Sequence, residues 1–237
     1  MSGRDPSLAR WSPGTRMTAF VAVMLPLVLS LGFWQLDRRG EKLAYEAQYF
    51  DRMGMLPTTP EPAGPFAPFT RLRLQGRYEP THSFLVDNQV HQGRAGYRVV
   101  TSFADQSGRR WLVNRGWVAA AESRAQLPVF DTPEETVTLV AVIWPDTGLP
   151  PLLGDDPWPT AWPKRVQRLD VAQMAARLEA AQPLEVRLEA GQPGVLAAAD
   201  LGVDFNPSRH LGYAVQWFGL ALALIAGYVI YGFRRHD

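Results

Sequence analysis

The sequence contains no cysteine, and this absence removes whole classes of structure and chemistry. Disulfides, thiolate metal sites and cysteine nucleophiles are all excluded. The four histidines include no pair at metal-ligand spacing, and no Gly-x-Ser-x-Gly nucleophile motif occurs. The 24 basic and 23 acidic residues leave a net charge of +1, and the arginines are scattered. We therefore predict a protein that is not an enzyme and does not bind nucleic acid.

Two long apolar segments dominate the sequence. Residues 17–34 form a run of 18 without a charge, and residues 211–233 form a run of 23. A helix rises about 1.5 Å per residue, so each run can cross a hydrocarbon core about 30 Å thick. A secretory signal peptide is the alternative for the first run, but no small-x-small cleavage pattern follows it. The sequence predicts an integral membrane protein that contacts the lipid bilayer through two helices.

The side on which the termini lie is not decided by charge. Five basic residues flank the predicted spans on the terminal side and five on the loop side. Cytoplasmic loops usually carry more Lys and Arg than loops on the other side, so equal counts do not indicate the orientation. The basic N-terminal leader favours cytoplasmic termini, and its shortness favours a bacterial inner membrane over an organelle. We expect both termini in the cytoplasm and the central domain in the periplasm.

The segment between the spans has three successive patterns. A helical pattern continues to about Arg52, and a proline-rich linker follows at residues 57–68. From Thr70 the apolar period becomes two, with turn residues at 105–108, which is typical of short antiparallel strands. Asp170 caps one short helix, and residues 184–188 return to strand. We expect an α+β membrane protein in which two transmembrane helices flank an antiparallel β barrel or sandwich.

These patterns divide the chain into six segments. They are a cytoplasmic leader (1–16), a first transmembrane helix (17–34), a helical extension with the linker (35–69), an extracytoplasmic β-rich domain (70–205), a second transmembrane helix (206–233) and a cytoplasmic tail (234–237).

The entry to the second span gathers unusual side chains. His210, Tyr213, Ala214 and Trp217 lie on one stripe of the predicted helix. In one interpretation, His210 and Tyr213 anchor the helix at the membrane–water interface, and Gln216 forms a hydrogen bond to the first helix. In the other, His210 is an axial ligand for an iron-bearing apolar cofactor, with Tyr213 and Trp217 as walls.

Three further features have two interpretations each. Gln35, Arg38 and Lys42, on one face of the first helix, are either a solvated flank or a cationic site for propionates or an acidic partner. The loop 148–163 carries tryptophans that either anchor it on the sheet or dock a partner. The segment 114–117 (Asn-Arg-Gly-Trp) predicts a bulge or a close backbone approach, with its arginine stacked on the tryptophan or paired with a carboxylate.

Together, five motifs resemble the Surfeit locus protein family of cytochrome c oxidase assembly factors, bacterial type. In order they are residues 32–38 (GFWQLDR), 76–78 (GRY), 93–101 (GRAGYRVVT), 113–118 (VNRGWV) and 210–218 (HLGYAVQWF). The positions where the family often has proline are Ser102 and Ala119 here, which affects only loop shape.

The resemblance implies a protein that is not a catalyst and that assists delivery of heme a to oxidase subunit I, beside heme A synthase. It implies that His210 is the ligand of the heme iron, with Trp34 and Trp217 as facing aromatics. It also implies cytoplasmic termini. The alternative function is a docking chaperone that stabilises nascent oxidase subunits without binding heme.

Overall fold

The chain divides into two compact units, and each is described here by itself. A computed structural model describes residues 11–61, 66–123, 125–146, 148–152, 154, 156–178, 181–197 and 205–234. One unit comprises residues 1–48 with 204–237, and the other comprises residues 49–203. Most of the predicted leader and tail, residues 1–10 and 235–237, lies outside the described residues, as does part of the linker, 62–65.

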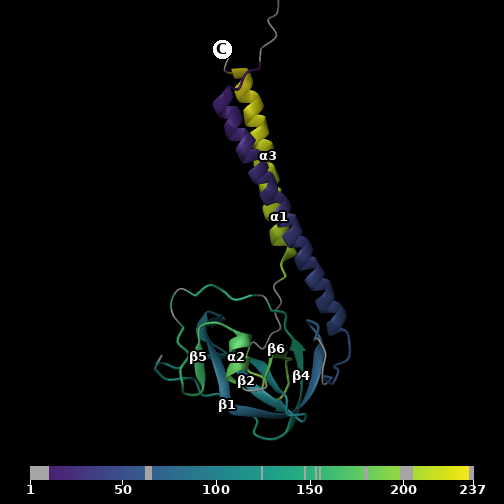
Figure 1. Ribbon diagram of the computed structural model, residues 1–237, viewed down its shortest axis with the longest axis vertical. Helices are drawn as coiled ribbons and strands as arrows, with labels where there is room; N and C mark the ends of the chain where they lie inside the picture. Colours follow the sequence, from purple (N-terminus) through teal and green to yellow (C-terminus); the bar gives the residue numbers. More distant parts are fainter. Residues whose placement is uncertain are drawn as a thin grey trace, which may run out of the picture. The chain divides into compact units, whose positions relative to one another are not determined.

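The first unit consists of two helices that run antiparallel (Figure 1). Helix α1 spans Thr15–Met53 and helix α3 spans Pro207–Arg234. The predicted extension of the first helix to about Arg52 is confirmed. The helices meet near one end through Thr18 and Tyr228, whose hydroxyl oxygens are 2.8 Å apart. At the level of Gly32 the Phe33 and Phe218 rings lie edge to face.

Both helices are long and apolar enough to cross a membrane. Only 17% of the apolar window of α1 and 11% of that of α3 is buried. A core helix of a soluble protein would bury most of such a window, whereas lipid-facing helices leave it exposed. Large apolar side chains such as Val23 and Leu222 each remain 69% exposed. The helix pair therefore fits a membrane protein.

The second unit is a six-stranded sheet with one short helix. Its elements are β1 (Arg71–His91), β2 (Arg94–Asp105), β3 (Arg110–Ala119), β4 (Val137–Ile143), β5 (Lys164–Val166), α2 (Val171–Arg177) and β6 (Ala181–Leu188). The strand order is β2-β3-β6-β4-β1-β5, and β1 also pairs with β2. Strand β1 therefore has three neighbours, β2, β4 and β5.

The prediction of an antiparallel sheet is wrong, because the sheet is mixed. Strand β5 pairs parallel with β1, and β6 pairs parallel with β3. Short turns produce antiparallel neighbours, but β5 follows a long loop and β6 follows α2, so neither is bound by that rule. The predicted choice between barrel and sandwich stays a prediction. The α+β class, with two flanking helices and one short internal helix, is confirmed.

The sequence alternates in two separate segments, residues 71–75 and 83–86, and both belong to one strand. Strand β1 runs for 21 residues, with register shifts at Glu79/Ser83 and Val86/Gln89. The shifts bend the strand, so that its first part pairs with β4 and its second with β5. Strand β5 was not predicted, because three residues are too few to show a period of two.

Local signals at the element ends are confirmed. The Asp170 carboxylate accepts a hydrogen bond from Gln173 N at 3.0 Å and caps α2. Asp105 and Gly108 close the β2–β3 turn, with Gly108 at φ +83°. Asn206 precedes α3, and its side-chain oxygen accepts from Arg209 N at 3.3 Å.

The sheet has a hydrophobic cluster on each face. One is centred on Trp111 and Leu139, both fully buried. The other lies beneath α2, where Met174 packs with Phe84. The indoles of Trp158 and Trp162 pack against this second cluster, with Trp162 5.0 Å from the Phe84 ring between centroids. The prediction that tryptophans anchor the loop 148–163 is confirmed, and its docking role stays a prediction.

Candidate functional site between the two helices

A polar contact joins the apolar helices near the start of α3. His210 Nδ1 lies 2.8 Å from Gln35 Oε1, and the Gln35 side chain is buried against α3. A carbonyl oxygen only accepts, so Nδ1 carries the hydrogen in this arrangement. The neutral imidazole then has its lone pair on Nε2. The contact therefore fixes both the orientation and the tautomer of His210.

Small residues permit this contact. Ala214, one turn after His210, is 1% exposed and faces α1. A Cβ placed on Gly32 would come within 2.7 Å of Phe218 Cε1. Small side chains let helix backbones approach closely in lipid. The polar pair can form only because the positions next to it carry almost no side chain.

The expected stripe on α3 is present, because the helix is continuous from Pro207 to Arg234, but its members differ in burial. Ala214 is buried against α1, but Tyr213 is 47% exposed and Trp217 is half-buried. Phe218, which the sequence analysis did not single out, makes the aromatic contact to Phe33. The hypothesis that Gln216 bonds across to the first helix is wrong. Gln216 lies on an exposed face, and His210 makes the cross-helix hydrogen bond instead.

Arg38 is engaged on its own helix. Its guanidinium lies 2.7 Å from Glu41 Oε2, and its Cζ is 5.8 Å from the centroid of Trp34. The Arg38 and Glu41 side chains are both about half exposed, and such pairs stabilise by only about 0 to 1 kcal/mol. An anionic group could therefore displace Glu41 at little cost. Sequence reasoning missed Glu41, although its i+3 spacing from Arg38 was a visible signal.

The side chains at this site suit one bond from a histidine to iron. They do not suit a metal site held by several protein ligands. Among the residues that the structure describes, no group of three or more His, Asp or Glu could hold a metal ion. His210 supplies one imidazole, and the hydrogen bond to Gln35 is the kind of outer contact that orients an iron-binding histidine. These residues fit a heme whose apolar face lies in hydrocarbon.

The segment 114–117 has a structural role in the sheet unit. Arg115 is fully buried and donates to Gly194 O at 2.7 Å, to Thr132 Oγ1 at 2.6 Å and to the Asp131 carbonyl. Its Cζ lies 5.1 Å from the Tyr78 ring. Burial lowers the pKa of Arg115 and raises that of Tyr78 to about 12.

The predictions for this segment are partly confirmed. Gly116 has φ +107° beside a register shift between β2 and β3, as expected of a bulge. The predicted partners of Arg115 are wrong, because it donates to two backbone oxygens and the Thr132 hydroxyl and lies against Tyr78. The indole of Trp117 instead lies over Gly96, where a Cβ would come within 2.5 Å of the ring.

Comparison with known proteins places these features in a family context. The sequence profile of the SURF1 family matches residues 22–222. A SURF1-like protein of Rickettsia felis is 26% identical over 226 residues, which cover 89% of this chain and 94% of that protein. An uncharacterized SURF1-like protein of Mycobacterium tuberculosis is 29% identical over 174 residues, which cover 71% of this chain and 62% of that protein. The matched region includes both His210 and Gln35.

Proposed function

Because this chain belongs to the SURF1 family, which is generally tied to cytochrome c oxidase assembly, we propose that it assists delivery of heme a to oxidase subunit I. In this role the chain is a carrier and not a catalyst, and heme a is its cargo. The protein works beside heme A synthase in the bacterial inner membrane. Its termini are cytoplasmic and its sheet unit is periplasmic.

The observation that carries the proposal is the hydrogen bond between His210 and Gln35. It leaves Nε2 with its lone pair available at the end of an apolar helix pair. Bound heme supplies an iron that accepts this lone pair. Tyr213 and Trp217 on α3, with Trp34 on α1, would hold the porphyrin. Arg38 would bind a propionate in place of the Glu41 carboxylate.

The single histidine ligand and the Arg38–Glu41 pair both suit transient binding of heme. One imidazole makes one axial bond, so release requires breaking only that bond and the apolar contacts. The Arg38–Glu41 pair is exposed and weak, so propionate binding and release cost little. A carrier needs such reversibility, because its cargo has to pass to the oxidase.

The engagement of Arg38 by Glu41 also favours a second candidate. If the pair persists, Arg38 is not free for a propionate. The protein would then act as a docking chaperone that stabilises nascent oxidase subunits without binding heme.

The test is the pigment spectrum of the full chain purified from cells that make heme A. We expect co-purifying heme a in the wild type, loss of most of it in His210→Ala, and partial loss in Gln35→Ala, because the imidazole loses its orientation. Arg38→Ala should retain more heme than His210→Ala. Gln216→Ala, a polar substitution on an exposed face of the same helix, is the matched control.

Absorbance at the heme band relative to protein gives the occupancy, and circular dichroism checks that each variant is folded. A wild type that never carries heme, or a folded His210→Ala that keeps it, would contradict the carrier role. Either outcome would leave the docking chaperone as the explanation of an assembly defect.

A further inference from the structure

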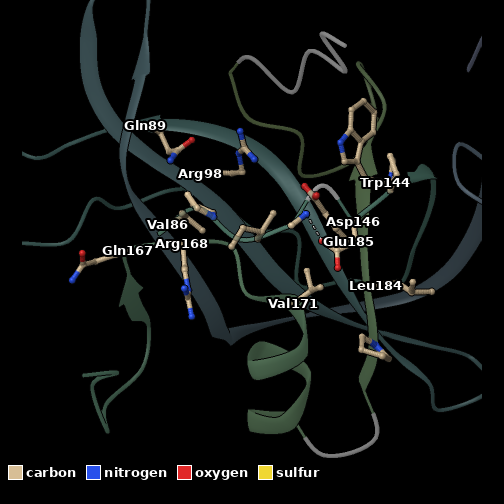
Figure 2. A pocket seen from close by; sticks show the side chains of 15 residues that line it. Val86, Gln89, Arg98, Trp144, Asp146, Gln167, Arg168, Val171, Leu184 and Glu185 are labelled. Atoms are coloured by element: carbon tan, nitrogen blue, oxygen red, sulfur yellow. Dashed lines mark hydrogen bonds between the residues drawn. The ribbon is translucent and has the colours of Figure 1, made fainter. Parts of the chain in front are cut away.

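The sheet unit contains a cavity that is separate from the helix pair. Its volume is about 250 Å³. Figure 2 shows the side chains around it, contributed by β1, β2, β6, the segment after β4 and the start of α2. Its lining mixes polar and apolar side chains, and they include Val86, Arg98, Trp144, Val171, Leu184 and Glu185.

Arg98 lines this cavity, and its guanidinium has no acidic partner among the described residues. The residue is half-buried on β2. The acidic groups nearby are already engaged. Glu185 accepts from Arg187 Nε at 2.9 Å and from Asn114 Nδ2 at 2.5 Å.

The remaining acids around the cavity are held in the same way. Asp170 pairs with Arg168 at 3.5 Å and caps α2. Asp146 accepts from Gly148 N at 2.8 Å on the exposed rim. Arg98 therefore has unused capacity to donate hydrogen bonds into the cavity.

A second guanidinium lies close to Arg98. Arg187 stacks on Trp144, with its Cζ 3.6 Å from the ring centroid. Burial lowers the pKa of Arg187, and the positive charge of Arg98 lowers it further, while Glu185 opposes both effects. The charges of Arg98 and Arg187 therefore repel each other, and Glu185 offsets this repulsion at Arg187. An anion beside Arg98 would relieve this repulsion.

Size and charge restrict the occupant. The volume is below the roughly 300 to 1,000 Å³ of typical ligand pockets, so a porphyrin is too large. Among the described residues that line the cavity, Arg98 is the guanidinium without an ion pair, and the carboxylates of Glu185 and Asp146 repel a dianion. The apolar side chains of Val171 and Leu184 in the lining suit a short hydrocarbon group.

We propose that this cavity binds a monocarboxylate that carries a short apolar group, with Arg98 holding the carboxylate. The carboxylate belongs either to a free small acid or to the C-terminus or acidic side chain of a partner protein. This binding site is independent of the function proposed for the helix pair, since no residue is shared.

Ligand-observed NMR of the full chain in detergent tests the proposal. The probes are sodium hexanoate, neutral hexanamide, inorganic phosphate and the peptide N-acetyl-Ala-Leu-Leu with a free C-terminal carboxylate. We expect hexanoate to bind at least tenfold more tightly than hexanamide or phosphate. Peptide binding tenfold tighter than hexanoate identifies a partner protein as the source, and equal or weaker peptide binding identifies a free acid.

Variants assign the binding to this cavity. Arg98→Gln should weaken hexanoate binding about tenfold or more, because a charge-assisted hydrogen bond is lost. Arg98→Lys should weaken it less. Val171→Trp should block binding by filling the cavity while leaving the charge intact. Arg94→Gln, an exposed arginine on the same strand, should leave the affinity within twofold.

Three results would overturn the proposal. One is equal binding of hexanoate and hexanamide, which would show that charge is not recognised. Another is unchanged hexanoate affinity in both Arg98→Gln and Val171→Trp, with folding verified by circular dichroism. Absence of binding by hexanoate and peptide alike at millimolar concentration would have the same consequence.

Discussion

The Asp105 carboxylate organises the turn between β2 and β3. It accepts hydrogen bonds from Ser107 N at 2.9 Å, Arg109 N at 3.0 Å and the Trp111 indole at 2.9 Å. Burial alone raises the pKa of Asp105, but the hydrogen bonds to Ser107, Trp111 and the backbone outweigh burial. The pKa therefore lies below its ordinary value of 3.8.

This lowered pKa determines the sign of an acid effect. Because the folded pKa is below the unfolded one, the stabilisation is present above the unfolded pKa and is lost as pH falls through the folded pKa. We expect Asp105→Asn to lower the free energy of unfolding at pH 7 by about 1 to 3 kcal/mol. The loss on acidification from pH 5 to pH 3 should become smaller than in the wild type.

Urea unfolding of the full chain in detergent, followed by tryptophan fluorescence at several pH values, measures both quantities. Asp51→Asn, an exposed carboxylate on α1, is the control and should change stability by under about 0.5 kcal/mol. A wild-type acid dependence retained in full by Asp105→Asn would show that other carboxylates cause it.

At the scale of elements, the close approach of α1 and α3 depends on Gly32. Its missing side chain leaves room for the Phe218 ring, which a Cβ would approach within 2.7 Å. The His210–Gln35 hydrogen bond lies one turn away along the same contact. Packing at Gly32 and the geometry of the candidate site are therefore coupled.

Gly32→Leu should separate the helices. Axes of packed helices lie about 8 to 10 Å apart depending on the side chains between them, so we expect an increase of about 2 Å. Overpacking of this kind costs about 1 to 3 kcal/mol. Nitroxide labels on Leu36→Cys and Leu211→Cys report the distance, because the chain has no other cysteine.

Gly219→Leu provides the matched control for this experiment. A Cβ there meets nothing within 4 Å, so the label distance should stay unchanged. An unaltered distance in Gly32→Leu as well would mean that the Phe218 ring moves aside and that the glycine is not needed for the contact.

At the scale of the whole molecule, the antiparallel helix pair bears on membrane topology. Thr18 of α1 meets Tyr228 near the end of α3, so a membrane crossed by both helices has the start of α1 and the end of α3 on the same side. The balanced flanking charges do not choose that side. The family role proposed for the chain requires the sheet unit to be periplasmic.

Reporter fusions test this orientation. A reporter that is active only in the cytoplasm should be active after Asp237 and inactive when inserted at Gly154, which is exposed. A periplasmic reporter should give the opposite result. Reversed activities would place the sheet unit in the cytoplasm and remove the topology on which heme delivery to the outer face rests.

Sequence reasoning reached the features that local interactions set. The two apolar runs, the Asp170 cap, the turn at Asp105 and the bulge at Gly116 each depend on residues close together in the chain. His210 was also identified as a candidate, because a histidine at the edge of an apolar helix is conspicuous. Its partner Gln35 was named for a different role, since helix pairing brings together residues far apart in sequence.

The sequence by itself determined where the helices and most strands lie, because hydrophobic periodicity and capping act within a few residues. Only the tertiary structure decided the parallel pairings of β5 and β6, the backbone partners of Arg115 and the cavity at Arg98. Each of these depends on which distant segments become neighbours. That choice is made by the packing of the whole sheet, and no local pattern encodes it.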